Sequence, residues 1–129
     1  VVKFTSRRRS LLGVANRDLL RRIVLNFVDN ALHYGGDKTP VVLSTTVLEG
    51  GAKIRLGVRD YGPAVSGSVA KNIGSAPEVL HNRPESSGLG IYIARQFAEA
   101  MNAQIGTTRH RDGATFYVDI GTSTQMRLL

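Results

Sequence analysis

The stretch from Arg17 to Tyr34, RDLLRRIVLNFVDNALHY, decides the fold, because its pattern predicts one long amphipathic helix. At about 100° per residue, Asn26, Asn30 and His33 fall on a single face of this helix. Apolar residues occupy the neighbouring arc, which we expect to face the core: Leu20, Ile23, Val24, Phe27, Val28 and Ala31. A side-chain amide at the edge of a buried face is costly unless it is hydrogen-bonded, so the two asparagines indicate a ligand.

Signals along the rest of the chain predict alternating strands and helices. Asn16 stands where an N-cap is expected, and Gly35-Gly36 gives a C-terminal stop to the first helix. The further elements expected, in chain order, are an edge hairpin from 1–5 and 11–15, a hairpin from 41–49 and 52–60, a second helix over 91–101, and a last hairpin from 103–110 and 114–120. The run 52–60 places alternate apolar residues on one face: Ile54, Leu56 and Val58.

The composition describes one folded domain over 1–129 and excludes disulfide and thiolate chemistry, because the chain has no cysteine. No apolar run reaches the roughly 20 residues that a membrane-spanning helix needs. Val1 in place of methionine indicates a mature fragment or an excised domain, which we expect to be cytoplasmic whether or not its parent protein has a membrane anchor.

The formal net charge of +7 is concentrated before residue 23. It fits a solvated surface, or a patch that attracts nucleic acid, anionic lipid, a polyphosphate or an acidic protein. No nucleic-acid-binding motif accompanies the charge, so no direct contact with nucleic acid is expected.

The segment 61–87 differs from the rest, because glycines, prolines and small residues interrupt any periodicity. A long irregular connection inside a compact domain is usually functional or mobile, so this segment is a candidate lid. The tail 121–129 is expected to fray.

Three motifs stand in order along the chain: N-F-V-D-N-A-L-H-Y (26–34) on the first helix, D-Y-G-P-A (60–64) at a strand end, and S-S-G-L-G-I (86–91) opening the second helix. Together they resemble the GHKL superfamily, and most closely the catalytic ATP-binding domain of sensor histidine kinases. The resemblance covers about 11–120. It implies a Bergerat-type fold, an α/β two-layer sandwich of a mixed, mostly antiparallel sheet with helices on one face, and strands with a single buried side fit that layering.

The resemblance implies that the domain binds ATP with Mg²⁺ and transfers the γ-phosphoryl group to a histidine on a separate dimerisation domain, with a response regulator downstream. Asn30 matches the family's magnesium-binding asparagine, and Mg²⁺ prefers such hard oxygen ligands. Asn26 is implied as a phosphate or metal contact and as the catalytic residue that orients the incoming imidazole. His33 is implied as a phosphate contact, and Tyr34 as the aromatic residue beside adenine.

At the opposite end of the implied pocket, Asp60 matches the aspartate that accepts a hydrogen bond from the adenine amino group. A carboxylate buried at a strand end needs such a donor. Gly62 would let the backbone approach the base. The turn that opens the second helix would bind phosphate through backbone N–H groups: Ser87, Gly88, Leu89 and Gly90.

Each position also has an ordinary structural reading. The asparagines could be ordinary polar residues on a helix surface, His33 could favour the end of the helix, and Tyr34 could belong to the core. Asp60 could cap a turn, and the glycine pair could simply start a helix.

The chain departs from the family pattern in having Ala64 for a glycine and Ser86 for another, and no phenylalanine in 61–87. Two other functions therefore stay open: a degenerate GHKL nucleotide-binding or protein-interaction module, and another GHKL enzyme such as an anti-sigma-factor-like serine kinase. A gyrase-like ATPase fits less well, because those enzymes use a glutamate base where Asn26 stands.

Overall fold

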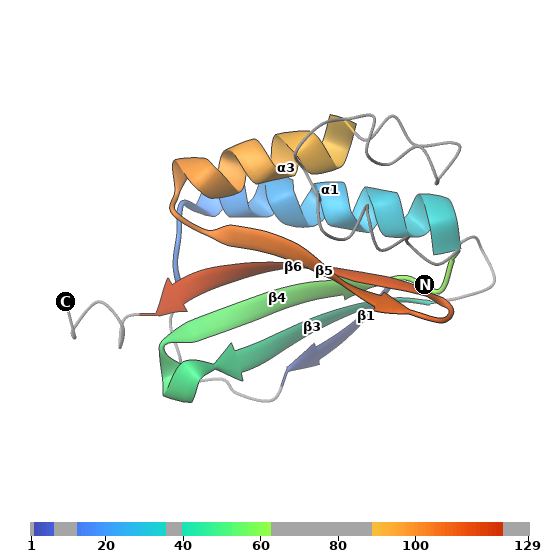
Figure 1. Ribbon diagram of the computed structural model, residues 1–129, viewed down its shortest axis with the longest axis horizontal. Coiled ribbons are helices and arrows are strands. Elements are labelled where there is room, and N and C mark those ends of the chain that lie inside the picture. Colours follow the sequence, from blue (N-terminus) through green and yellow to red (C-terminus); the bar gives the residue numbers. More distant parts are fainter. Residues whose placement is uncertain (1, 7–12, 36–39, 63–88, 123–129) are drawn as a thin grey trace.

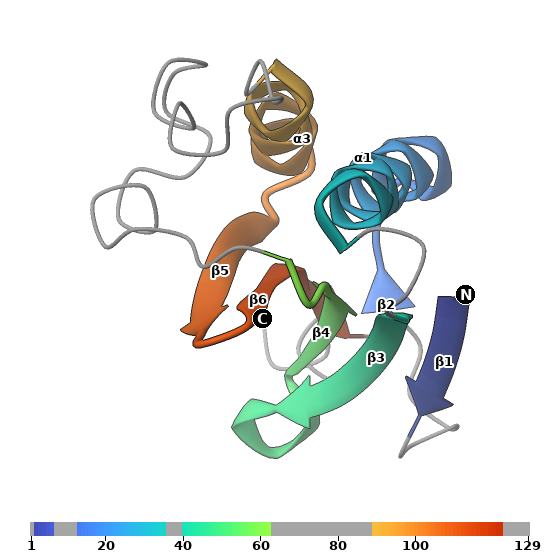
Figure 2. The same ribbon diagram turned by 90° about the vertical axis from the view of Figure 1, so that its right-hand side faces the viewer.

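The computed structural model describes residues 2–6, 13–35, 40–62 and 89–122, which form a sheet with two helices packed on one of its faces (Figures 1 and 2). In chain order the elements are β1 (Val2–Ser6), β2 (Gly13–Val14), α1 (Arg17–Gly35), β3 (Val41–Leu48), the short 3₁₀ helix η1 (Glu49–Gly51), β4 (Lys53–Arg59), α3 (Leu89–Ala100), β5 (Gln104–His110) and β6 (Gly113–Thr122). The predicted α/β two-layer sandwich is confirmed.

The sheet is mixed but mostly antiparallel, as predicted. Its strand order is β1-β3-β4-β6, and both β5 and β2 pair with β6. Only the β1–β3 pairing is parallel among the described strands. The predicted edge hairpin between 1–5 and 11–15 is wrong, because β1 pairs with β3 while β2 pairs with the end of β6. The unpaired edges of these two longer strands offer backbone partners to each short run, so the two runs complete different edges of the sheet.

The start of α1 follows from its capping residue. The backbone N–H of Leu19 donates to Oδ1 of Asn16 at 3.0 Å, which confirms the predicted N-cap. The predicted apolar arc of α1 faces the sheet, and Ile23, Phe27 and Ala31 are fully buried. The Phe27 ring lies 5.9 Å from the Phe116 ring of β6, measured between centroids, and this contact joins the two layers.

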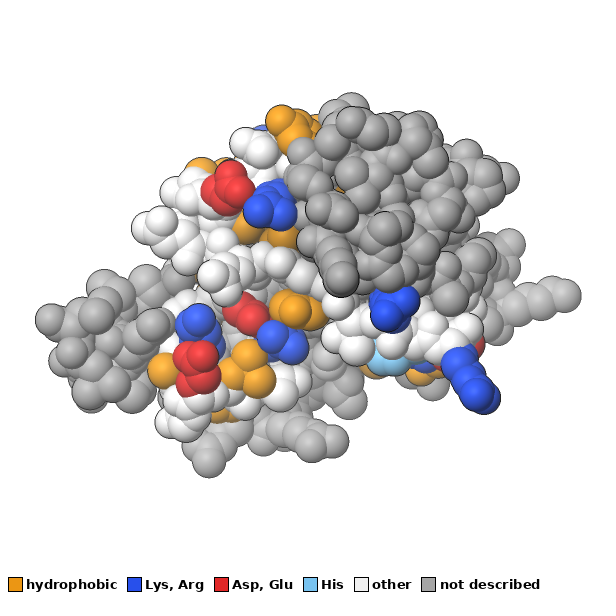
Figure 3. All heavy atoms as spheres, in the orientation of Figure 1, with side chains coloured by type: hydrophobic (Ala, Val, Ile, Leu, Met, Phe, Trp, Pro, Cys, Tyr) orange, Lys and Arg blue, Asp and Glu red, His pale blue; other side chains and the backbone are white. Residues whose placement is uncertain are grey.

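The two faces of β4 differ, because successive side chains of a strand point to opposite sides. Ile54, Leu56 and Val58 pack with the core below the helices, as their alternation predicted. Arg55 and Arg59, which alternate with these residues, lie on the outer face, where each forms an ion pair with an aspartate. In Figure 3, acidic and basic side chains lie next to each other on the visible surface of the described residues.

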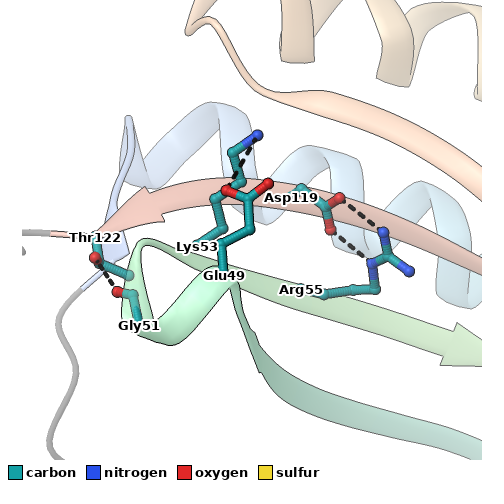
Figure 4. A network of polar contacts seen from close by, with 6 residues as sticks. All are labelled: Glu49, Gly51, Lys53, Arg55, Asp119 and Thr122. Atoms are coloured by element: carbon teal, nitrogen blue, oxygen red, sulfur yellow. Dashed lines mark hydrogen bonds and ion pairs between the residues drawn. The ribbon is translucent and has the colours of Figure 1, made fainter. Parts of the chain in front are cut away.

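On the outer face, Arg55 forms a two-pronged ion pair with Asp119 of β6 (Figure 4). The guanidinium carbon also lies 3.7 Å from the centroid of the Tyr117 ring. The Tyr117 ring in turn lies across Gly106 of β5, where a β-carbon would collide with the ring and its hydroxyl. These contacts tie three neighbouring strands together on the side away from the helices.

The corner between β3 and β4 closes the far end of the sheet. Glu49, Gly50 and Gly51 all have positive φ there, at 51°, 63° and 102°. The hydroxyl of Thr122 donates to the carbonyl oxygen of Gly51 at 2.5 Å (Figure 4). Because this bond and the pairing with β2 continue β6 to Thr122, the strand ends two residues later than the predicted 114–120.

Candidate functional site

The elements that carry the described site residues come together where β4 ends, under the two helices. α1 and α3 lie side by side over the sheet, with the first turn of α3 next to the middle of α1 (Figures 1 and 2). The end of β4 runs toward the C-terminal end of α1 (Figure 1). This arrangement places α1, the end of β4 and the start of α3 next to one another.

Asp60 is completely buried at the end of β4, with 0% of its surface exposed. Its backbone N–H donates to the carbonyl oxygen of Ala114 at 2.9 Å, and its Oδ1 accepts the N–H of Gly62 at 3.0 Å. The carboxylate therefore does cap the turn into Gly62. A turn cap can remain exposed to water, and burying an ionised carboxylate costs free energy. Turn capping alone therefore does not account for the complete burial of Asp60.

Gly113, which the sequence marked only as a turn residue, packs directly against Asp60. A β-carbon at Gly113 would lie 2.7 Å from Oδ1 of Asp60 and closer still to its carbonyl oxygen. The φ of Gly113 is +117°, a value that favours glycine. The contact joins positions 53 residues apart, so the Asp-Gly turn signal alone gave no sign of it.

The amide stripe of α1 is only partly open to solvent. Asn26 and Asn30 are both partly buried, whereas His33 is exposed in the last turn of α1. Nδ2 of Asn30 is shielded from solvent and has no hydrogen-bond partner within the described part of the chain. Buried polar atoms of native proteins nearly always have a partner, so this amide is the clearest sign of a ligand.

Asn26 faces the beginning of α3. A β-carbon at Gly90 would lie 4.0 Å from Oδ1 of Asn26, so the two predicted site residues are neighbours. α3 begins at Leu89, two residues before the predicted start, which puts Leu89 and Gly90 inside its first turn. Backbone N–H groups in a first helical turn are available to an anion.

Some predicted site residues lie outside the described residues. These are Ser87 and Gly88, together with most of the proposed lid (63–87). For Tyr34 the structure describes only the backbone, at the end of α1.

A metal ion at this site would depend on amide oxygens. Within 2–6, 13–35, 40–62 and 89–122, no three His, Cys, Asp or Glu side chains come together as a metal site. Asn26 and Asn30 present neutral oxygen donors, which suit Mg²⁺ when a bound phosphate and water supply the remaining ligands. The residues present therefore fit Mg²⁺ carried by a phosphate-bearing ligand.

No helix of the described residues is both long and apolar enough to cross a membrane.

Comparison with known proteins identifies the family. Residues 15–124 match the family described as histidine kinase-, DNA gyrase B-, and HSP90-like ATPases. Sensor protein KdpD of Mycobacterium tuberculosis is 32% identical over 113 residues, which are 84% of this chain and 13% of KdpD. The C4-dicarboxylate transport sensor protein DctB of Rhizobium meliloti is 24% identical over 110 residues, 85% of this chain and 17% of DctB. The chain thus spans a small part of these relatives.

Solved structures share the fold. Full-length ShkA in complex with AMPPNP superposes with a TM-score of 0.77 at 25% identity, over 95% of this chain and 26% of ShkA. The catalytic domain of histidine kinase ThkA gives a TM-score of 0.74 at 22% identity, over 93% of this chain and 77% of that one. The predicted family and the predicted Bergerat-type fold are confirmed. The chain belongs to the histidine kinase-, DNA gyrase B- and HSP90-like ATPases.

Proposed function

We propose that this domain binds ATP with Mg²⁺ between α1, the end of β4 and the start of α3, and transfers the γ-phosphoryl group to a histidine on a separate dimerisation domain. The observation that carries the proposal is the buried amide nitrogen of Asn30, which lacks a partner among the described residues, on the helix that also places Asn26 beside Gly90. The AMPPNP complex of ShkA, whose fold this chain shares, supports the same choice of ligand.

Asp60 recognises the base in this proposal. Its buried carboxylate accepts a hydrogen bond from the 6-amino group of adenine, while Gly62 leaves room for the ring and Tyr34 packs beside it. A purine with a 6-keto group would place its keto oxygen, which only accepts hydrogen bonds, against the Asp60 carboxylate, which also accepts. Recognition by a buried charged acceptor discriminates strongly, because a ligand without the donor displaces water and offers the carboxylate no hydrogen bond in return.

The polar side chains of α1 and the first turn of α3 hold the triphosphate. Nδ2 of Asn30 donates to a phosphate oxygen, and Oδ1 of Asn30 would be the side-chain group that holds the metal. His33 and the turn Ser87, Gly88, Leu89 and Gly90 supply further N–H donors to phosphate. When bound, Mg²⁺ would neutralise part of the triphosphate charge.

Asn26 orients the incoming imidazole, because its Oδ1 lies beside Gly90 in the first turn of α3, one helical turn of α1 before Asn30. Phosphoryl transfer needs little covalent chemistry from the protein, so positioning and charge stabilisation supply the rate. We further propose that 1–129 is one cytoplasmic domain of a longer protein, with 61–87 as its lid, and that the phosphohistidine passes its group to a response regulator.

Calorimetric titration with ATP and Mg²⁺ tests binding. We expect heat and a raised melting temperature for the natural chain, and neither for Asn30→Ala. A single-turnover assay with radiolabelled ATP and the cognate dimerisation domain then tests transfer. Absence of heat would refute the nucleotide site, whereas binding without labelling of the histidine would identify a degenerate module instead of a kinase.

A further inference from the structure

Arg59 adjoins Asp60 in sequence but contacts residues on the other side of the sheet. Its Nη2 lies 2.7 Å from Oδ1 of Asp112 in the β5–β6 turn. Its guanidinium carbon lies 4.3 Å from the centroid of the Tyr61 ring. The Arg59 side chain thus links Tyr61, the residue after Asp60, to the β5–β6 turn, which packs against Asp60.

We propose that Arg59 is a positioning residue for base recognition, which holds Asp60 in register through a clamp formed by Arg59, Tyr61 and Asp112. The inference rests on the proposed role of Asp60 toward adenine and adds residues that touch no part of the nucleotide. Selectivity for the 6-amino group then depends on an ion pair on the outer face of the sheet.

The first arm of the clamp fixes the chain on both sides of Asp60. Arg59 precedes the aspartate and Tyr61 follows it, so stacking of the guanidinium on the Tyr61 ring restrains the backbone between them. Tyr61 is 37% exposed, and this stack is a described contact that holds its ring. The bond from Gly62 N–H to Oδ1 of Asp60 depends on that same short stretch of backbone.

The second arm fixes the surface on which Asp60 rests. Asp112 immediately precedes Gly113, whose backbone lies against the carbonyl and carboxylate of Asp60 with no room for a side chain. The next residue, Ala114, accepts the backbone N–H of Asp60. Asp112 itself is 64% exposed, so the ion pair adds little stability on its own, but it sets where the turn lies.

A hydrogen bond to a buried carboxylate depends strongly on distance and angle. A small shift of Asp60 therefore weakens binding of a nucleotide that has the 6-amino group, and leaves binding through the phosphates unchanged. Loss of the clamp is expected to lower selectivity for the base more than it lowers overall affinity.

Arg55 supplies a matched control within the same strand. It lies four residues before Arg59 on the same outer face, pairs with an aspartate and stacks on a tyrosine at 3.7 Å. None of its described contacts touches Asp60 or the β5–β6 turn. Removing Arg55 therefore removes the same kinds of interaction without disturbing the base pocket.

The test compares two nucleotides in each variant. The dissociation constants of ATP and of purine riboside triphosphate, which lacks only the 6-amino group, are measured by calorimetry with Mg²⁺. Their ratio is insensitive to a reduced folded fraction, because that fraction affects both constants equally. We expect the natural chain to prefer ATP by about tenfold or more.

Asp60→Asn should reduce that preference most. Arg59→Gln and Asp112→Asn should each lower it by about threefold or more, and the double variant should lower it no further. Arg59→Lys should restore part of it, because lysine keeps the charge but not the flat stack. Arg55→Gln should leave the ratio unchanged.

The outcomes separate two failures. A natural chain without preference for ATP, or an Asp60→Asn variant that keeps the preference, would refute the proposed role of Asp60 and with it the clamp. An intact preference in both Arg59→Gln and Asp112→Asn, after Asp60→Asn has lost it, would overturn the clamp alone. An equal loss in Arg55→Gln would also overturn it, because general loosening of β4 would then explain the effect.

Discussion

Arg55 donates two hydrogen bonds to Asp119 across β4 and β6, from Nε to Oδ1 at 2.8 Å and from Nη2 to Oδ2 at 2.9 Å (Figure 4). Only 11% of the Asp119 side chain is exposed. Removing the guanidinium leaves that carboxylate without its main donor, so Arg55→Gln should lower the free energy of unfolding by about 1–2 kcal/mol. Urea denaturation measures this, and an unchanged midpoint would contradict it.

The same pair predicts a pH dependence. The hydrogen bond to Asp119 raises the pKa of Arg55 above its ordinary value. A raised pKa in the folded state contributes stability that is present below the unfolded pKa and is lost only as the pH rises through the folded one. The difference in unfolding free energy between the natural chain and Arg55→Gln should therefore stay constant from about pH 7 to about pH 10. A difference that shrinks within this range would argue against the pair as its source.

Gly113 and Gly50 form a matched pair of glycines with positive φ, at +117° and +63°. A β-carbon at Gly113 would collide with Asp60, whereas nothing lies within 4 Å of one at Gly50. Gly113→Ala should therefore cost about 2–4 kcal/mol from strain plus overpacking, and Gly50→Ala about 1 kcal/mol from strain alone. Thermal and urea unfolding of both variants measure the costs, and similar values would show that Gly113 lies in open space.

We expect Asn30 to serve nucleotide binding without stabilising the nucleotide-free protein. Because its buried Nδ2 lacks a partner in the described part of the chain, Asn30→Ala should leave the nucleotide-free protein as stable as before or raise its unfolding free energy by up to about 1 kcal/mol. Asn16→Ala is the control on the same helix, since it removes a capping bond and should cost about 1 kcal/mol.

The two variants should respond oppositely to ATP with Mg²⁺ in a thermal shift assay. Asn16→Ala keeps the ligand-induced rise in melting temperature, and Asn30→Ala loses it. A clearly destabilised Asn30→Ala would show that the amide has a structural partner after all.

Gly106 lies beneath the ring of Tyr117, which leaves no space for a β-carbon. Gly106→Ala should cost about 1–3 kcal/mol, because the ring must move and lose its stack with Arg55. In a Tyr117→Ser background the same change should cost under about 0.5 kcal/mol. A double-mutant cycle by urea denaturation measures the coupling, and additive costs would exclude this contact as the cause.

Features of the fold that depend on local sequence were predictable. The amphipathic period, the Asn16 cap and the alternation of Ile54, Leu56 and Val58 each record a short-range preference, and the structure has all three. The Asp-Gly turn was found for the same reason. Asn26 and Asn30 were recognisable as candidates because costly amides stood at the edge of an apolar face, whereas Asp60 was named through its resemblance to a family motif.

Features that depend on distant partners were not predictable. The runs 1–5 and 11–15 looked alike in propensity, and only the free edges of β3 and β6 determine where each one pairs. The contact of Gly113 with Asp60 and the ion pair of Arg59 with Asp112 join residues more than fifty positions apart. No local pattern in a single sequence records such contacts.

Arg59, Asp60 and Tyr61 are consecutive residues, and the aspartate points inward while both neighbours contact each other outside. Deleting or inserting one residue in β4 would exchange the two sides, placing a cation or a phenol in the pocket and a carboxylate on the outer face. Length changes in this strand are therefore tolerable only in steps of two residues. Homologous domains and designed variants that keep adenine selectivity should therefore differ in the length of β4 only by an even number of residues, even where little of its sequence is preserved.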